Sequence, residues 1–321
     1  MRHVLLPVPL LPAGGRRFDV AGLGQNSVDL LALLREFPAS NSKHRIERFA
    51  RLPGGQVASA MVCCARLGWR AAYLGRFGDD ELGVIGRDSL AGAGVDISAA
   101  EIVSGALNRF ALILVDGRTG ERTVLWDRDA RLALTPADVP GDAIRDARVL
   151  LVDCDDVDAS IEAARVAREA GVITVIDVEM LLPGLDSLLP LIDVVIASEG
   201  FPQQLTGEQE TGRALARLEA ELNPALACVT LGPQGSLARC QGREIRTPGF
   251  HVHVVDSTGA GDAFRGGFIS ALLQSEGKGE LASLLRMANA VAALSCRRPG
   301  ARDGLPERAE VEALLAGAEV A

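Results

Sequence analysis

Apolar and polar positions follow two repeating patterns along most of this chain. Short apolar runs of the kind that form buried strands occur at 18–23, 71–74, 149–152, 173–176, 194–197 and 228–231. Longer segments with helical spacing lie between them, at 57–67, 81–91, 159–169 and 212–222. Strands that alternate with helices predict βαβ units, and therefore an α/β fold with a doubly wound, mostly parallel sheet flanked by helices.

Two stretches interrupt this alternation. Both have the pattern of β-ribbons, and in the second a turn at Asp116-Gly117 separates apolar runs at 111–115 and 123–125. We expect them to form small lid inserts, at about 38–53 and 107–127, over the carboxyl ends of the strands, where doubly wound folds bind ligands. No repeat or linker divides the chain, so a single domain over 1–321 is predicted. Exposed β-edges in such lids favour a homodimer in which the lids pair.

Composition places the chain among ordinary globular proteins. It has 321 residues, of which 48% are hydrophobic and 23% charged, enough for a sizeable core. A net charge of −9 argues against a nucleic-acid partner, which would require clustered basic residues. An acidic protein can still bind a nucleotide through backbone amides and a metal ion.

Cellular location is suggested by the cysteines and the N-terminus. The six cysteines lack the spacing of a metal site, so we expect reduced thiols and a cytoplasmic protein. Three prolines interrupt the apolar segment 4–13, which we interpret as a frayed lead-in to the first strand rather than a signal peptide. No apolar run approaches the length of a membrane helix, so no membrane partner is expected.

The segment 254–264, Val-Val-Asp-Ser-Thr-Gly-Ala-Gly-Asp-Ala-Phe, carries the clearest chemistry. It is predicted to join a strand to a helix through a glycine turn. Backbone amides of Gly259, Ala260 and Gly261 at a helix start would form an anion hole for a phosphoryl group. Asp262 would supply a carboxylate base beside it. The alternatives are a helix N-cap for Asp262 and a merely tight turn for the glycines.

This segment resembles the Asp-Thr-x-Gly-Ala-Gly-Asp signature of the PfkB, or ribokinase-like, family of carbohydrate kinases. A second resemblance lies near the N-terminus, in Gly54-Gly55-Gln56 and in the run 75–83. Both motifs occur in the family's order, and the resemblance covers roughly 18–310. It implies a ribokinase-like fold, Mg-ATP as phosphoryl donor and a sugar hydroxyl as acceptor.

The resemblance also implies roles for individual residues. Asp262 would be the catalytic base, and Gly259 to Gly261 the anion hole. The acceptor sugar would be bound by residues of the first strand, the glycine pair and the lid: Asp29, Asn26, Gly55, Gln56, Lys43 and Arg109. ATP would be bound by Thr230, Gly232, Gly235, Thr258 and Asn289. For Asp29 a helix-start carboxylate is the alternative, and for Lys43 a solvated charge. Trp126 is interpreted as a packing residue, with a substrate contact as the alternative.

Metal binding departs from the family pattern. The usual Asn-x-x-Glu is replaced by Ser198-Glu199-Gly200-Phe201, so Glu199 is the nearest carboxylate and would act on Mg²⁺ through water. Asp256 would either organise its loop or contribute to a monovalent cation site, such as one for potassium. The serine variant and the run 298–306 resemble the ketohexokinase and sulfofructose-kinase branch. Asp155 stands where that branch implies a sulfonate-binding arginine, which disfavours a sulfonated substrate.

Three functions remain open from the sequence. The favoured one is an ATP-dependent kinase for a small carbohydrate such as a keto-hexose, a keto-deoxy sugar acid or ribose. The second is a nucleoside kinase of the same fold, which would need an aromatic or apolar pocket for the base in the lid. The third is a non-catalytic sugar or nucleotide sensor, suggested by the missing Asn-x-x-Glu. A P-loop motif is absent and a complete dinucleotide fingerprint is lacking, which argues against P-loop ATPases and NAD enzymes.

Overall fold

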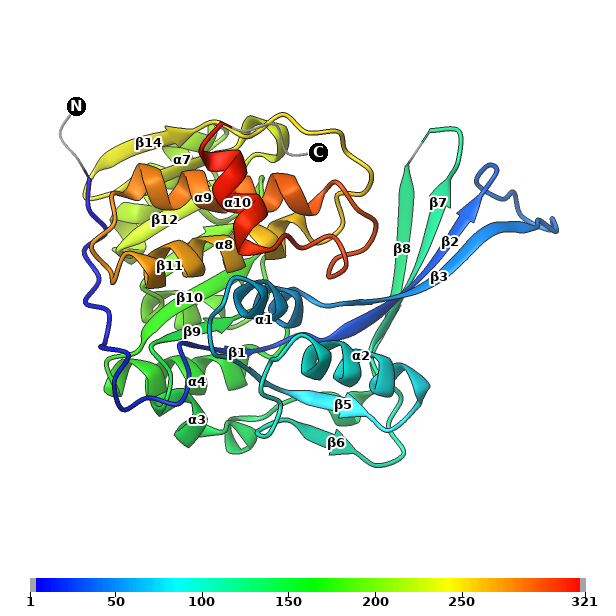
Figure 1. The fold of residues 1–321 in the computed structure, drawn as a ribbon, viewed down its shortest axis with the longest axis horizontal. Helices are drawn as coiled ribbons and strands as arrows, with labels where there is room; N and C mark the ends of the chain where they lie inside the picture. The colour runs from blue at the N-terminus through cyan, green and yellow to red at the C-terminus, as the bar shows by residue number, and fades with distance from the viewer. Residues whose placement is uncertain (1–3, 120, 318–321) are drawn as a thin grey trace.

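Eight strands form the central sheet in the computed structural model, which describes residues 4–119 and 121–317. Their order is β14–β13–β12–β11–β10–β9–β1–β4 (Figure 1). The six strands from β12 to β4 pair in parallel, and β13 and β14 continue the sheet antiparallel. The strands are β1 Val20–Leu23, β4 Ala71–Leu74, β9 Val149–Val152, β10 Ile173–Val178, β11 Val194–Ala197, β12 Leu226–Thr230, β13 Ser236–Cys240 and β14 Arg243–Thr247.

The predicted alternation of strands and helices is confirmed. Strands β9 and β11 have the bounds expected from their apolar runs, and β10 and β12 differ by one or two residues. The longer helices are α1 Gln56–Arg66, α2 Glu81–Gly92, α4 Val157–Glu169, α7 Thr211–Leu222, α8 Ala260–Gln274, α9 Leu281–Ser295 and α10 Arg308–Leu315. Shorter helices are α3 Gly141–Arg145, α5 Leu185–Leu188 and α6 Phe201–Thr206.

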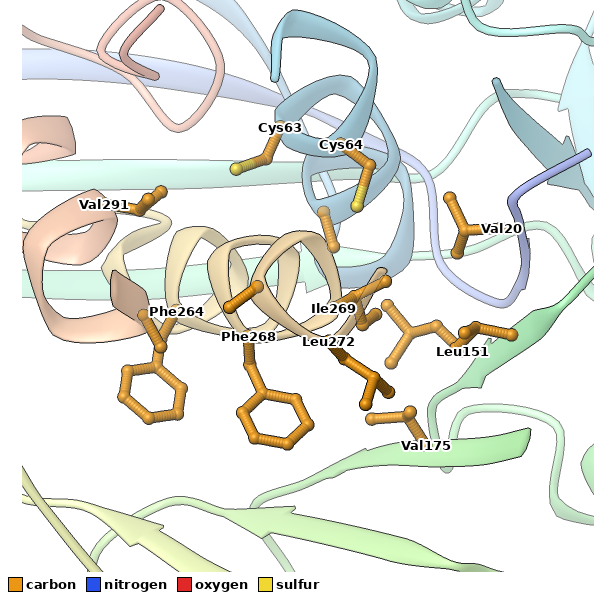
Figure 2. Close-up of a cluster of buried hydrophobic side chains, with 14 of the residues drawn as sticks. Val20, Cys63, Cys64, Leu151, Val175, Phe264, Phe268, Ile269, Leu272 and Val291 are labelled. Carbon is orange, nitrogen blue, oxygen red and sulfur yellow. The ribbon is translucent and has the colours of Figure 1, made fainter. Parts of the chain in front are cut away.

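Alternation along each strand divides the interior into two cores. Val20, Leu151 and Val175 belong to one hydrophobic cluster, with α1, α8 and α9. Their sequence neighbours Ala21, Leu150 and Ile176 belong to the other, with α4 and α7. Successive side chains of a strand point to opposite faces, so a strand buried on both faces is apolar throughout. Figure 2 shows the first core, where Phe264 and Phe268 of α8 lie between the cysteines of α1 and the strands.

A second sheet stands away from the body and forms the lid (Figure 1). Its order is β3–β2–β7–β8, with β2 Ser27–Leu34, β3 Ile46–Gly54, β7 Phe110–Asp116 and β8 Arg122–Asp127. The inserts at 38–53 and 107–127 therefore hold β3, β7 and β8, but the prediction missed β2. That strand follows β1 after a short turn, and its apolar run lacks the polar alternation that marks a half-buried strand. A small parallel pair, β5 Arg76–Gly78 and β6 Glu101–Val103, lies apart from both sheets.

The N-terminal segment is packed rather than frayed. Leu6 and Val8 are buried in the first core, and Leu5 forms a bridge with Glu280 before α9. Within residues 4–119 and 121–317, no helix has both the length and the apolar character needed to cross a bilayer. The six cysteines, all inside these ranges, are free thiols, and five of them are buried.

Candidate active site

The loop that carries Asp262 leads directly into α8. Gly259 is the N-cap, with φ of 76°, and α8 begins at Ala260, so the amides expected to form an anion hole lie at a helix start. The apolar strand expected before this loop is absent. Residues 250–258 have irregular backbone, and Val254 and Val255 are more than half exposed. His251 and His253 lie in this irregular segment.

Asp256 fixes the loop by its two carboxylate oxygens. One accepts a hydrogen bond from the Thr258 amide at 2.9 Å, and the other from the Gly300 amide at 2.9 Å. Burial alone would raise the pKa of Asp256, but these backbone hydrogen bonds outweigh it and the pKa lies below the usual value. These hydrogen bonds fit the loop-organising role for Asp256, and the monovalent cation site stays a prediction.

Two cavities meet at this loop. One, of about 660 Å³, opens between the loop and the lid, and the other, of about 500 Å³, lies on the side of β12 and α9. Ser257, Ala260 and Gly261 line both cavities, whereas Asp262 lines only the one beneath the lid. A group that passes from one cavity to the other would cross the amides at the start of α8.

The cavity beneath the lid contains most of the predicted sugar-binding residues. Asp29, Gly55, Gln56 and Arg109 line it together. Asp29 lies on β2, opposite Leu52 of β3, so it is a lid-strand residue and does not start a helix. Burial raises the pKa of Asp29 to about 6, against the opposing charge of Arg302. Its carboxylate is thus ionised at neutral pH, ready to accept hydrogen bonds from hydroxyl groups.

The other two predicted sugar ligands lie elsewhere. Asn26 is buried, and its side-chain oxygen accepts a hydrogen bond from Arg302 Nη2 at 2.7 Å. The same Nη2 lies 2.5 Å from the Gly54 carbonyl oxygen, so Arg302 ties the C-terminal loop to the root of the lid. Lys43 is exposed between β2 and β3 and lies outside the cavity lining, which agrees with the solvated alternative.

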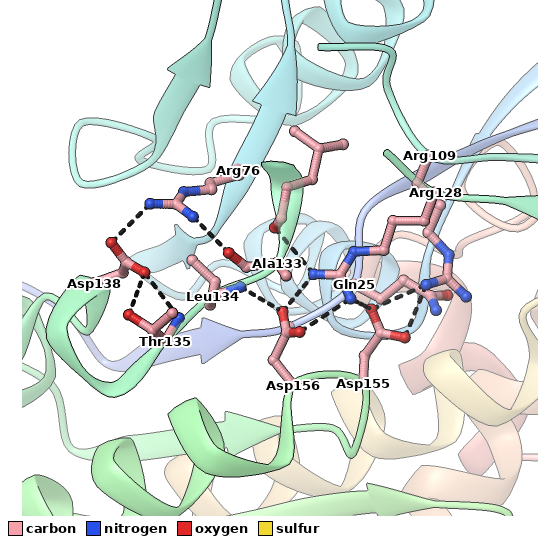
Figure 3. Close-up of polar contacts among 12 residues, drawn as sticks. Gln25, Arg76, Arg109, Arg128, Ala133, Leu134, Thr135, Asp138, Asp155 and Asp156 are labelled. Carbon is pink, nitrogen blue, oxygen red and sulfur yellow. Dashed lines mark hydrogen bonds and ion pairs between the residues drawn. The ribbon is translucent and has the colours of Figure 1, made fainter. Parts of the chain in front are cut away.

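Arginines and aspartates form a connected network at the base of the lid (Figure 3). Arg109 Nη1 lies 2.8 and 2.9 Å from the two oxygens of Asp155, and Arg128 Nη1 lies 2.8 Å from one of them. Arg128 Nη2 also lies 2.5 Å from Asp156. Both oxygens of Asp155 thus face guanidinium groups, so the repulsion of an anionic substrate by a bare Asp155, expected from the sequence, does not apply.

Trp126 is exposed to the cavity instead of packed in the core. Its exposed fraction is 64%, and the Arg109 guanidinium lies 4.7 Å from the centroid of its ring. Val124 and Ile113 line the same wall of the cavity. The lid therefore presents an aromatic and apolar face to whatever binds beneath it, and the packing interpretation of Trp126 is wrong.

Carboxylates surround the proposed base. Burial, and next the neighbouring Asp177, raise the pKa of Asp262 well above the usual aspartate range, while Arg265 opposes them. Asp177 lies at the carboxyl end of β10 and forms an ion pair with Arg265 at 2.6 Å. Burial raises the pKa of Asp177 to about 6 in spite of that pair. A carboxylate with a raised pKa at the end of a cavity is suited to accept a proton near neutral pH.

The second cavity collects most of the predicted nucleotide residues. Thr230, Gly232, Gly235 and Asn289 line it, together with the exposed segment around His251. The Asn289 amide nitrogen lies 3.2 Å from Ser236 Oγ and 3.2 Å from the Thr247 carbonyl oxygen, which fixes α9 against β13 and β14. Thr258, the remaining candidate, lines the cavity beneath the lid instead.

The metal ligand suggested by the sequence does not reach either cavity. Glu199 is exposed and lies outside both linings, whereas its neighbour Ser198 lines the cavity beneath the lid. In the described parts of the chain, no three His, Cys, Asp or Glu side chains gather to hold a metal ion by themselves. Asp29, Glu179 and Asp262 line the cavity without an ion pair to an arginine among the described contacts, and of these three Glu179, beyond the end of β10, is the exposed one. These donors fit an Mg²⁺ ion that keeps its waters and is carried mainly by nucleotide phosphates.

Comparison with known proteins shows to which family the chain belongs. The model of the pfkB family carbohydrate kinases matches residues 18–308. The chain belongs to the PfkB family of carbohydrate kinases. It is therefore a phosphotransferase, and the ribokinase-like fold expected from its motifs is confirmed.

PfkB relatives resemble the chain over most of its length. The probable fructokinase-4 of Arabidopsis thaliana is 32% identical over 294 residues, covering 84% of this chain and 89% of the relative. The nucleoside kinase of Methanothermobacter thermautotrophicus is 27% identical, covering 91% and 94%. The structure of Arabidopsis thaliana ribokinase complexed with ribose and ATP has a TM-score of 0.80 at 25% identity, covering 93% and 98%. These relatives do not tie the chain to the ketohexokinase branch.

Several side chains of this PfkB site escaped sequence reasoning: Arg122, Arg128, Asp177, Glu179, Arg265 and Arg302. Two of these residues, Asp177 and Arg265, could have been recognised from their sequence context. Asp177 directly follows the apolar run of β10, at the carboxyl end where ligands bind. Arg265 is a charged residue inside the apolar start of α8, which is unusual for a buried helix.

Proposed function

We propose that the protein is an ATP-dependent sugar kinase in which Asp262 is the general base. The observation that carries this proposal is the division of the site at the start of α8. Two cavities share Ser257, Ala260 and Gly261, and the carboxylate of Asp262 faces only the cavity beneath the lid. This arrangement suits a donor on one side, an acceptor hydroxyl on the other, and a phosphoryl group that passes between them.

The proposed chemistry is a direct in-line transfer. A sugar hydroxyl beneath the lid gives its proton to the Asp262 carboxylate while its oxygen forms a bond to the γ-phosphorus of ATP. The bond between that phosphorus and the leaving oxygen breaks, and ADP remains in the second cavity. The amides of Gly259, Ala260 and Gly261 stabilise the charge on the transferred group.

Magnesium would bind as part of Mg-ATP and neutralise phosphate charge when bound. Glu179 and Ser198 are the side chains placed to contact its waters, because both line the cavity near Asp262. Lid residues would exclude bulk water and hold the sugar. Asp29 would accept hydrogen bonds from sugar hydroxyls, and Gln56 and Arg109 would donate to sugar oxygens.

The acceptor is a small carbohydrate. Relatives carry the names fructokinase and ribokinase, which supports a keto-hexose or a pentose as the first candidates. A panel of hexoses, pentoses, sugar acids, sugar phosphates and nucleosides, scored by ADP release with Mg-ATP, tests this directly. Sugar-dependent ADP release supports the proposal. Binding of ATP and a sugar without ADP release from any acceptor would instead support a sensor.

A nucleoside kinase is the second candidate function. The exposed Trp126, with Val124 and Ile113 beside it, provides the aromatic and apolar wall that a nucleobase would need. A nucleoside kinase also stands among the relatives. In the same panel, a kcat/KM for nucleosides that exceeds the value for every free sugar would favour this function.

Asp29→Asn is expected to raise the KM for the sugar by about 10–100-fold, because a charged hydrogen-bond acceptor contributes about 1.5–3 kcal/mol. The KM for ATP should change little, since Asp29 lies outside the second cavity. Steady-state kinetics with each substrate varied in turn measures the split. Asp127→Asn, which removes an exposed lid carboxylate outside the cavity lining, is the matched control. An equal rise in both KM values would contradict the assigned role.

We also propose that the lid mediates a homodimer. Phe49 and Leu125 are each about half exposed, and the strand register puts them on the face of the lid sheet opposite to the cavity-lining Val124 and Trp126; this sheet stands away from the body (Figure 1). Burial of such a surface in a partner would remove apolar area from water. Light scattering at micromolar concentration should report twice the monomer mass, and Leu125→Lys should lower it. A monomeric mass for the unsubstituted protein would refute the dimer.

A further inference from the structure

Arg265 places a buried guanidinium beside the proposed base. It lies three residues after Asp262 on α8, so both side chains project from the same side of the helix. Arg265 is only 2% exposed and yet lines the cavity beneath the lid. Its Nη2 lies 2.6 Å from Asp177 Oδ1 and 3.3 Å from the Ile196 carbonyl oxygen. Two neighbouring strands, β10 and β11, thus hold the guanidinium in one position.

The anion-hole turn leaves space for this guanidinium. A Cβ atom on Gly261 would lie 2.5 Å from Arg265 Nη1, which is closer than atoms can approach. The glycine therefore provides room for the arginine as well as access to its own amide. Among the described residues, Arg265 Nε has no hydrogen-bond partner. Such a buried and incompletely paired ion is costly, and an apolar pair would usually be at least as stable. A role at the site explains its presence better than stability does.

The groups that face Asp262 are mostly acidic. From the end of β10 and the residues after it come Asp177 and Glu179, and from the lid comes Asp29. Cys63 of α1 also lies within electrostatic reach and is held neutral, because burial raises the pKa of its thiol. The cations that face Asp262 are Arg265, from its own helix, and Arg302, from the C-terminal loop. Arg302 is committed to Asn26 and to the Gly54 carbonyl oxygen.

We propose that Arg265 is a positioning residue that keeps Asp262 available as an ionised base, and that Asp177 holds Arg265 in the place where it does so. This inference rests on the proposed function, since it assigns a partner to the proposed base. Asp177 alone would oppose ionisation of Asp262, because two carboxylates repel. The Asp177–Arg265 pair adds almost no net charge. It nevertheless holds the Arg265 guanidinium next to the start of α8, where Asp262 would accept the proton.

The test is a double-mutant cycle read through the pH dependence of kcat/KM. Arg265→Gln removes the cation, so the pKa of Asp262 rises and the acid limb of the profile moves up by about one pH unit. Below that limb, kcat/KM falls about tenfold. Asp177→Asn removes the anion, while the hydrogen bond to the Ile196 carbonyl oxygen still holds Arg265 near Asp262, so the limb moves down. The double variant removes both charges, leaves no buried ion unpaired, and returns the limb to near its original pH. It also keeps the cycle informative if Arg265→Gln alone folds poorly.

Arg148→Gln is the matched control. Arg148 is another buried arginine, with 1% side-chain exposure and an ion pair to Glu276 at 2.5 Å, but it precedes β9 at the opposite end of the sheet. Its loss should lower the melting temperature without moving the acid limb. If Arg265→Gln lowers only stability or kcat and the limb stays in place, Arg265 is structural and the proposal is overturned.

A second readout does not depend on turnover. The ¹³Cγ resonance of Asp262, assigned by its loss in Asp262→Asn, can be titrated in each variant by NMR. The same order of pKa values is expected, with Arg265→Gln above the unsubstituted protein and Asp177→Asn below it. If no acceptor is phosphorylated, the proposed function fails while this titration still tests the pair. Identical titration curves in all variants would overturn the inference even in an active kinase.

Discussion

Asp262→Asn is expected to lower kcat by about 10²–10⁴-fold, the usual contribution of a positioned general base. The asparagine amide has nearly the same shape but cannot accept the hydroxyl proton. ATP affinity should stay within about twofold, because Asp262 lies outside the second cavity. Coupled ADP-release kinetics and equilibrium ATP binding measure the two effects. Turnover near the original rate would remove Asp262 as the base.

The same substitution is expected to stabilise the protein at neutral and higher pH. The pKa of Asp262 is raised in the folded state, so the folded protein binds this proton more tightly than the unfolded chain does. Its contribution to stability is present in full below the unfolded pKa and is lost as pH rises through the folded pKa. Asp262→Asn should therefore raise the melting temperature at pH 8 and change it little near pH 4. A lower melting temperature at pH 8 would show that the carboxylate is stabilised as an ion.

Glu199→Gln serves as the control for this experiment. Glu199 is an acidic residue at the same edge of the sheet, but it is exposed and lies outside both cavities. Its substitution should leave kcat within about twofold, as expected for a surface position. A large loss of activity, relieved by raising the Mg²⁺ concentration, would return Glu199 to the metal site that the sequence suggested.

Gly259→Ala is expected to lower kcat by about 10²–10³-fold, as loss of one oxyanion-type donor does. Gly259 has φ of 76°, where an L-residue is strained by about 1–2 kcal/mol. A Cβ atom there would also lie 2.7 Å from the Cβ of the buried Ala301. The turn must shift, and its amides would no longer converge on one point. We also expect a lower melting temperature.

Gly242→Ala is the control that separates the effect of backbone strain from the effect of the collision with Ala301. Gly242 has φ of 73° in the turn between β13 and β14, and a Cβ atom there would meet nothing within 4 Å. It should show the backbone strain without the collision and without any loss of turnover. If Gly259→Ala merely matches this control in stability and keeps its kcat, the anion hole lies elsewhere.

Much of the fold followed from local pattern. Buried parallel strands must be apolar on both faces, so β9 and β11 were visible as uninterrupted apolar runs with the bounds that the structure gives them. The same rule did not identify β2. Its continuous apolar run belongs to a lid sheet, and nothing within the run says which sheet it joins. The strand expected before Gly259 is absent. Val254 and Val255 are apolar, but they are exposed and not buried in a sheet.

The candidate site was likewise only partly predictable from the sequence. Residues contiguous in a motif, from Gly259 to Asp262, could be assigned from the sequence because a turn and a helix start place neighbouring residues together. For Asn26 and Asp29, three residues apart, the sequence could not show which side chain faces the cavity. Their strand places Asp29 in the cavity, while Asn26 is buried against Arg302.

By itself the sequence determined the α/β alternation, the family signature and the loop that carries the proposed base. Only the tertiary structure decided which charges face that base, because Asp177, Arg265 and Arg302 come from distant segments and meet at the edge of the sheet. Electrostatic influence depends on distance in space and on burial, neither of which the order of residues encodes. For the same reason Asp155 suggested repulsion of anions in the sequence, and only the folded protein shows it held between Arg109 and Arg128.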